Sequence, residues 1–267
     1  MSHGKLLPQM IGLTLGILLL VGCTTSQPPP AASTAKSSKI TLYYEERAQV
    51  ELVSSQGTRV LIDVFDPSAL TSPATEKDVL LTTHGHQDHI DRDFSDSFPG
   101  QQLRIREGEI HLSDVTITGI ASAHTAFDSD EFKPEGGSNY IFIVDMDGLR
   151  IVHFGDIGQD QLTQQQLDAL GTVDIAITQF VNSYSQMDLR NKKGFNLMAQ
   201  VKPKLIIPTH GGSDVDVVEY AMEQGWEVFA GAREVTIGHA DLSDTTRYLV
   251  LGESGPMLKK IFDLPEW

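Results

Sequence analysis

Short apolar runs recur between residues 40 and 252, and several alternate with polar positions in the manner of β-strands. QVELV and TRVLIDV flank the turn-forming SSQG, which predicts a β-hairpin. YIFIVD and LRIVHF flank MDG and predict a second hairpin, in which Gly148 suits a positive φ. DVLLTT is a continuous apolar run, as expected for a buried strand.

Helical periodicity joins the strand pattern in the second half of the chain. QDQLTQQQLDAL, NKKGFNLMAQV and SDVDVVEYAMEQG are typical of helices, and the last one ends at Gly225. Strand-like runs alternate with them, namely VDIAITQF, PKLIIPTH, EVFA and YLVLG. This order predicts a sheet-rich α/β core with helices packed outside it in layers. The pattern alone leaves the choice among α/β architectures open.

Residues 1–22 have the features of a secretory signal. A short n-region with Lys5 precedes an apolar run from Met10 to Val21. That run is shorter than the roughly 20 residues of a transmembrane helix and has the proportions of a signal h-region. The alternative is a short N-terminal anchor helix that is never cleaved.

The apolar run ends in LLVGC, which resembles the lipobox of bacterial lipoproteins, with Cys23 as the acylated residue. Cys23 is the only cysteine of the sequence, so it has no disulfide partner within the chain, and lipidation accounts for it. We therefore expect an exported protein that reaches the membrane through a lipid anchor at Cys23. By the same resemblance Thr24, in place of an aspartate, favours the outer membrane in a cell with two membranes.

These features divide the chain into three parts. Residues 1–22 form the signal peptide, residues 23–39 the lipidated cysteine and a tether rich in Pro, Ser, Thr and Ala, and residues 40–267 one folded domain. The formal net charge of −16 argues against nucleic acid as a partner, because an acidic surface repels phosphate backbones. A small-molecule substrate is expected instead, and the oligomeric state is left undecided.

Candidate chemistry concentrates in TTHGHQDHID, residues 82–91. His84 and His86 are two residues apart on an extended segment, so both can face one metal ion. Asp88 and His89 follow in a loop that can turn them toward a second position. Imidazole and carboxylate ligands together suit zinc, with manganese or iron as alternatives.

Three further ligand-type residues follow strand-like runs. His124 closes TITGIASAH, Asp156 lies in HFGDIG, and His210 ends PKLIIPTH. A single polar residue at a strand end has ordinary explanations. With the histidine cluster after DVLLTT, four strand-like runs in one chain end in ligand-type residues, and this predicts a shared metal site.

Together these motifs resemble those of the metallo-β-lactamase-fold hydrolases: H-x-H-x-D-H, a lone histidine, a GD after a strand, and P-x-H-G. The resemblance implies a four-layer αββα sandwich with a site for two divalent metal ions at one edge of its two sheets. The implied ligands are His84, His86 and His124 for one ion, Asp88, His89 and His210 for the other, and Asp156 as the bridge.

In such a centre, a hydroxide held by the two metals attacks the substrate. Asp88 is the candidate catalytic residue, because it can orient this nucleophile or accept its proton as well as ligate. Asp63 and His153, each near a strand end, are expected to support the ligands from behind. A serine or cysteine nucleophile is not expected, because the chain has no G-x-S-x-G element and its only cysteine is assigned to the anchor.

Within the superfamily the chain is most similar to the branch of the ascorbate-6-phosphate lactonase. GGSNYIFIVDMDGLRIVHFGDIG, LTQQQLDALGTVDIAI and PKLIIPTH carry this similarity. Relatives commonly have a proline and paired glycines after the strand that here reads VDIAIT, whereas this chain has QFVNSYSQMD at residues 179–188. The lactonase's substrate is therefore not transferred to this chain.

The expected function is that of a lipid-anchored hydrolase of an ester, lactone, amide or phosphoester. One alternative is a phosphodiesterase that acts on a small phosphodiester or a phospholipid headgroup. The other is a non-catalytic metal-binding lipoprotein of the cell envelope. The complete ligand set argues against this last alternative, because a site that has lost its catalytic function accumulates substitutions at its ligand positions.

Overall fold

The computed structural model describes Met1, residues 38–125 and residues 138–267. Nearly all of the described residues belong to one unit of the chain, Lys36–Trp267. Apart from Met1, the predicted signal peptide lies outside the described residues, and so do the lipobox cysteine and most of the tether. Within the described part of the chain, no helix has both the length and the apolar character needed to cross a bilayer.

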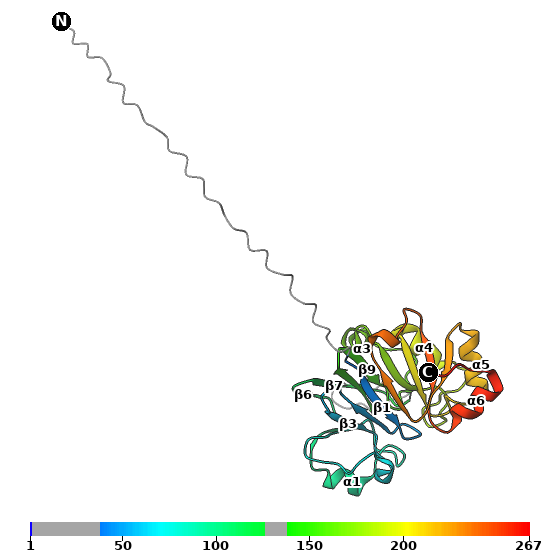
Figure 1. The fold of residues 1–267 in the computed structure, drawn as a ribbon, viewed down its shortest axis with the longest axis horizontal. Coiled ribbons are helices and arrows are strands. Elements are labelled where there is room, and N and C mark those ends of the chain that lie inside the picture. Colours follow the sequence, from blue (N-terminus) through cyan, green and yellow to red (C-terminus); the bar gives the residue numbers. More distant parts are fainter. Residues whose placement is uncertain (2–37, 126–137) are drawn as a thin grey trace, which may run out of the picture. The chain divides into compact units, whose positions relative to one another are not determined.

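Two sheets form the centre of the domain (Figure 1). The six-stranded sheet has the order β13 (Glu234–Ile237), β1 (Ile40–Tyr44), β2 (Val50–Val53), β3 (Arg59–Ile62), β4 (Val79–Thr82) and β5 (Gln101–Arg104). The eight-stranded sheet has the order β12 (Glu227–Ala230), β14 (Arg247–Val250), β11 (Leu205–Thr209), β10 (Ile175–Gln179), β9 (Leu149–His153), β8 (Asn139–Met146), β7 (Val115–Ser122) and β6 (Gly108–His111).

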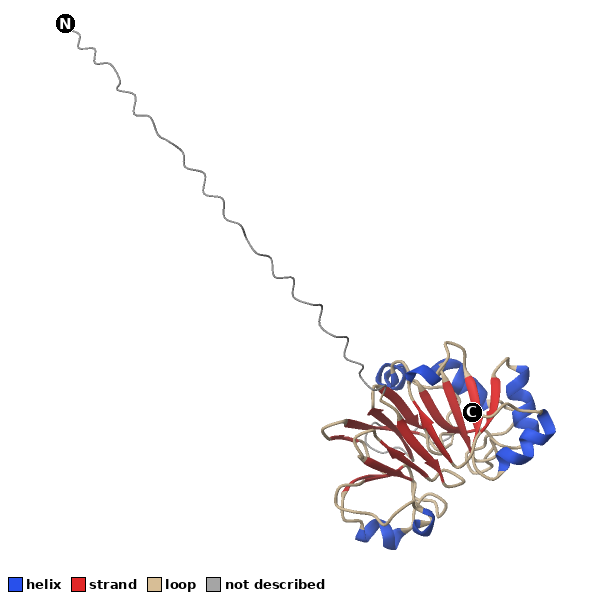
Figure 2. Ribbon diagram, viewed as in Figure 1, coloured by secondary structure: helices blue, strands red, loops and turns tan. Residues whose placement is uncertain are grey.

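Helices lie outside the strands (Figure 2). The short elements of the six-stranded side are the 3-10 helix η1 (Pro67–Ala69) and α1 (Arg92–Ser97). The later helices are α3 (Gln164–Leu170), α4 (Lys193–Val201), α5 (Val215–Glu223), the 3-10 helix η2 (His239–Asp241) and α6 (Ser254–Phe262).

Successive side chains of a strand point to opposite faces of its sheet, and each sheet has buried apolar residues on both faces. Ile62 of β3 and Phe142 of β8 lie in the core between the sheets. Their neighbour Leu61 lies on the outer face of the six-stranded sheet, in a cluster that Phe94 of α1 covers. The outer face of the eight-stranded sheet packs against α3, α4, α5 and α6. The domain is therefore the predicted four-layer αββα sandwich.

Both predicted hairpins are confirmed as antiparallel pairs, β2 with β3 and β8 with β9. Gly148 has the expected positive φ, of 77°. The helix predicted from QDQL onward begins later, at Gln164, because Thr163 caps it and Gln166 completes a capping box. The strand pattern did not reveal β13, which pairs with β1 from the other end of the chain.

Candidate metal centre

Five strands end at one edge of the sandwich, and a candidate ligand or its partner follows each of them. The parallel pairing of β3 with β4, and of β9, β10 and β11 with one another, brings their carboxyl ends to the same side. The residues placed there are Asp63 after β3, His84 after β4, His124 after β7, Asp156 after β9 and His210 after β11. His86, Asp88 and His89 follow in the loop after β4.

The first group of ligand-type atoms consists of His84, His86, His124 and Asp156, whose donor atoms all lie within 4.8 Å of one another. His84 Nε2 is 3.2 Å from His86 Nδ1. Asp156 Oδ2 is 3.7 Å from His84 Nε2 and 3.6 Å from His124 Nε2. These nitrogens converge on the space beside one carboxylate oxygen.

The second group consists of Asp88, His89 and His210, again within 4.8 Å of one another. The Nε2 atoms of His89 and His210 are 3.0 Å apart. Each lies 3.3 Å from Asp156 Oδ1. One carboxylate therefore presents a different oxygen to each group, which is the arrangement that a bridging ligand requires.

The residues present fit divalent cations. Asp156 Oδ1 and His124 Nε2 are buried and have no hydrogen-bond partner among the described residues. A buried polar atom without a partner costs free energy unless something else satisfies it. Nitrogen lone pairs that face one another around a carboxylate are satisfied by a cation, and imidazole with carboxylate is a donor set that zinc accepts.

Burial and neighbouring charges set the protonation of this site. Burial, together with the charge of His89, lowers the pKa of His84 to about 3, so its ring is neutral at neutral pH. Burial would also lower the pKa of His89, but Asp63 and Asp156 outweigh it and raise this pKa to about 10. Burial disfavours the ionised form of Asp156, yet the surrounding histidines hold its pKa below the ordinary range. The carboxylate is therefore ionised.

Asp63 supports ligands of both groups. This fully buried carboxylate accepts hydrogen bonds from Thr83 N and Thr83 Oγ1, each at 2.7 Å, and lies 2.8 Å from His89 Nδ1. Because the Thr83 hydroxyl donates to Asp63, its oxygen is free to accept from His84 Nδ1 at 3.0 Å. Both rings therefore direct Nδ1 to these partners and Nε2 to the site. A divalent ion bound there would displace the second proton that the raised pKa of His89 implies. Asp63 therefore contacts His89 directly and His84 through Thr83, and its support of bound metal stays a prediction.

Hydrogen bonds fix both the backbone and the side chain of Asp156. Asn139 Oδ1 accepts from Asp156 N at 3.0 Å, and Asn182 Nδ2 donates to Asp156 Oδ2 at 2.7 Å. Gly155 has φ 56°, and a Cβ there would lie 2.4 Å from Asn139 Oδ1, so only glycine fits. The sequence pattern alone does not predict Asn139 or Asn182 as site residues, although Asn139 lies in a segment that carries the family resemblance and Asn182 lies in the loop at residues 179–188.

His153 lies behind the site and serves backbone groups. Its Nε2 donates to Ala48 O at 3.0 Å, and its Nδ1 accepts from Gly155 N at 3.2 Å. His153 therefore holds the segment that precedes Asp156 and the turn that contains Ala48. Its support of the metal ligands stays a prediction.

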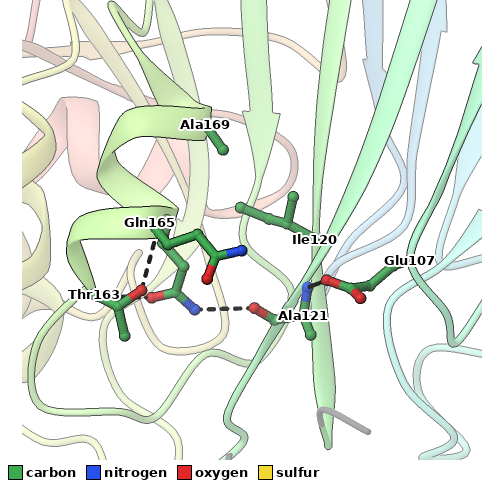
Figure 3. Close-up of a pocket in the computed structure, with 7 residues that line it drawn as sticks. Glu107, Ile120, Ala121, Thr163, Gln165 and Ala169 are labelled. Atoms are coloured by element: carbon green, nitrogen blue, oxygen red, sulfur yellow. Dashed lines mark hydrogen bonds between the residues drawn. The ribbon is translucent and has the colours of Figure 1, made fainter. Parts of the chain in front are cut away.

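A second contact network positions His124. Gln166 Nε2 of α3 donates to Ala121 O at 2.9 Å, beside a cavity of about 50 Å³ between α3 and β7 (Figure 3). Gln159 accepts from Ala123 N at 3.1 Å and donates to Gln166 Oε1 at 2.7 Å. This cavity has room for little more than solvent, and its walls hold the end of β7 in place.

A larger cavity, of about 510 Å³, opens on the candidate centre. His86, Asp88 and Asp156 line it together with Arg47, Phe65, Gln87 and Tyr184. Its volume is typical of a site for a small molecule. Tyr184 comes from the loop at residues 179–188 and is 76% exposed, and its ring centroid lies 5.9 Å from that of His86. Arg47 and Phe65 had no signal in the local sequence pattern.

The family model described as the beta-lactamase superfamily domain matches residues 41–210, well over half of the chain. The chain therefore belongs to the β-lactamase superfamily of metal-binding domains. A UPF0173 metal-dependent hydrolase of Thermococcus onnurineus is 24% identical over 188 residues, which is 61% of this chain and 80% of that protein. One of Archaeoglobus fulgidus is 28% identical over 178 residues, which is 57% of this chain and 75% of that protein.

Solved structures show the same fold. One from Thermotoga maritima, described as a Zn-dependent hydrolase of the metallo-beta-lactamase superfamily, is 19% identical and has a TM-score of 0.56. The match covers 80% of this chain and 98% of that one. The metallo-beta-lactamase fold protein YhfI of Bacillus subtilis is 13% identical, with a TM-score of 0.51 over 82% of this chain and 98% of YhfI. At these identities the likeness concerns the fold alone.

Proposed function

We propose that this protein is a metal-dependent hydrolase whose centre holds two divalent ions, with zinc favoured and manganese or iron as alternatives. The position of Asp156 carries the proposal, because its two oxygens face two separate sets of ligand-type atoms. His84, His86 and His124 would hold one ion, Asp88, His89 and His210 the other, and Asp156 both. The names of the metal-dependent hydrolase relatives support the same class of reaction.

Two bound divalent ions would lower the pKa of a water molecule toward neutrality and polarise a carbonyl or phosphoryl oxygen. The chain's own residues prepare this chemistry. Asp63 keeps His89 oriented, and Asn182 keeps Asp156 Oδ2 oriented. Asp88 lines the cavity with a side chain that is 31% exposed, so its carboxylate can orient a water molecule or take up a proton there. No serine or cysteine nucleophile is required.

The proposed substrates are esters, lactones, amides and phosphoesters. We place the chain near the ascorbate-6-phosphate lactonase branch on its GGSNYIFIVDMDGLRIVHFGDIG segment. The loop at residues 179–188 departs from that branch and brings Tyr184 to the cavity, which favours a different substrate.

Metal analysis tests the proposal. A chain that begins at Lys36, purified without chelator or metal-binding tag, is expected to contain close to two transition-metal ions per chain by mass spectrometry. A panel of 4-nitrophenyl esters, lactones and phosphodiesters should include at least one substrate whose turnover stops with chelator and returns with zinc or manganese. Failure to bind metal after refilling would refute the centre, and bound metal without any turnover would favour the non-catalytic alternative.

We further propose that the chain is exported and anchored to a bacterial membrane through lipidated Cys23, with the outer membrane favoured where two membranes exist. LLVGC and the Pro- and Ser-rich residues after it support this. In a bacterial host, Cys23→Ala should abolish labelling by an alkyne fatty acid and move the protein out of the membrane fraction. A Ser26→Ala variant serves as the control, and unchanged labelling of the cysteine variant would contradict the anchor.

A further inference from the structure

The cavity over the candidate centre has a cation that the proposed chemistry leaves unused. Arg47 is the one arginine or lysine among the seven residues that line the cavity. Its Nη1 lies 3.6 Å from Asp88 Oδ2, an ion-pair distance beyond hydrogen-bond range, and its side chain is 58% exposed. The guanidinium therefore faces the cavity with donor capacity for another group.

The turn that presents Arg47 is held firmly. Gln49 is fully buried, and its Oε1 accepts from Phe65 N at 3.1 Å and Asp66 N at 2.9 Å. The carbonyl of Ala48 accepts from buried His153, which also contacts the segment of Asp156. These contacts fix the turn to the same framework as the ligands, so Arg47 is positioned relative to the centre before any substrate binds.

The backbone and the ring below Arg47 add to this positioning. Glu46 and Arg47 have φ of 72° and 52°, a left-handed conformation that favours glycine and that non-glycine residues seldom adopt. Such conformations cluster at functional sites. The Cζ atom of Arg47 lies 5.5 Å from the centroid of the Phe65 ring, which restrains the guanidinium by a cation–π contact.

We propose that Arg47 determines specificity by binding an anionic oxygen group of the substrate, a carboxylate or a phosphoryl oxygen, close to the scissile bond. This inference rests on the proposed hydrolase function. Asp88 belongs to the second ligand group and pairs with Arg47, so the anionic group sits within a few bonds of the reacting atom. If the Asp88 carboxylate bound a metal ion, its ion pair with Arg47 would weaken, and the guanidinium would be more available to an anion. An anion also needs such a local cation, because the chain as a whole has a net charge of −16.

Matched substrates test this inference on the full-length chain in detergent micelles. Mono-4-nitrophenyl glutarate and 4-nitrophenyl valerate share a leaving group and an acyl length and differ in one carboxylate. Bis(4-nitrophenyl) phosphate supplies the phosphoryl anion. In Arg47→Gln, kcat/KM for at least one anionic substrate should fall about tenfold to a hundredfold, as loss of a hydrogen bond to a charged group implies. Activity on the valerate should fall much less than activity on that anionic substrate, and the metal content should match that of the wild type.

Arg247→Gln is the matched control. Arg247 also pairs with a carboxylate, Glu227 at 3.0 Å, and lies over a phenylalanine ring, Phe229 at 5.3 Å. It is not among the residues that line the cavity over the centre. The control should leave kcat/KM unchanged for all three substrates.

The outcomes separate the inference from the function on which it rests. A loss confined to the glutarate identifies a carboxylate, and a loss on the phosphodiester identifies a phosphoryl group. Equal losses on the neutral ester, or no loss at all, overturn the inference while wild-type turnover upholds the hydrolase. Calorimetry with glutarate and inorganic phosphate needs no turnover. The Kd of at least one of them should rise about tenfold in Arg47→Gln, and unchanged binding of both overturns the inference. A wild-type chain without metal, turnover or anion binding refutes both.

Discussion

Replacement of Asp156 by asparagine is expected to lower kcat/KM at least about a thousandfold. This exceeds the tenfold to hundredfold loss that is typical when a residue that hydrogen-bonds to a metal ligand is replaced. An asparagine cannot present an anionic oxygen to each ligand group, and its amide N–H groups would face imidazole nitrogens or metal ions. Metal content should fall below one ion per chain. Steady-state kinetics and mass spectrometry of the same preparation measure both effects.

Asp145→Asn is the control for this variant, because it removes a carboxylate from a half-buried ion pair with Arg150 on the neighbouring strand. It should retain metal and turnover. Circular dichroism of Asp156→Asn should show a folded domain, because the structure places Asp156 at a strand end and not in the apolar core. A folded Asp156→Asn protein with wild-type activity would rule out the bridging role.

Replacement of Asp63 by asparagine is expected to lower metal affinity or activity about tenfold to a hundredfold. The amide loses the charge that orients His89, and the hydrogen bonds to Thr83 that fix His84 weaken with it. Asp63 has φ 52°, which asparagine tolerates, so the backbone should persist. Competition with a zinc chelator measures the affinity.

Asp147→Asn matches this change closely. Asp147 also has φ 52° and also accepts from the backbone N–H and the hydroxyl of one residue, Ser55. It lies in the turn between β8 and β9. The control should leave zinc affinity unaltered, and equal affinities in the two variants would show that Asp63 has only a structural role.

Much of the fold can be predicted from short segments of the sequence. Turn chemistry at MDG and SSQG specifies hairpins between neighbouring segments, and such contacts need no information from distant residues. The short helix α1 and the strand β13 were not foreseen. A six-residue helix shows little periodicity, and β13 becomes a strand through pairing with β1, almost 200 residues away in sequence.

By itself the sequence determined which residues are of ligand type, that they follow strands, and that His84 and His86 belong together, because strand geometry and residue chemistry are local properties. Only the tertiary structure decided that Asp156 faces both groups of ligand-type atoms and that Asn182, 26 residues later in the sequence, donates a hydrogen bond to it. The tertiary structure also decided that Arg47 pairs with Asp88. These relations join segments that neither pattern nor spacing connects. Packing of the two sheets and their loops creates them, and the specificity proposed for Arg47 depends on that packing.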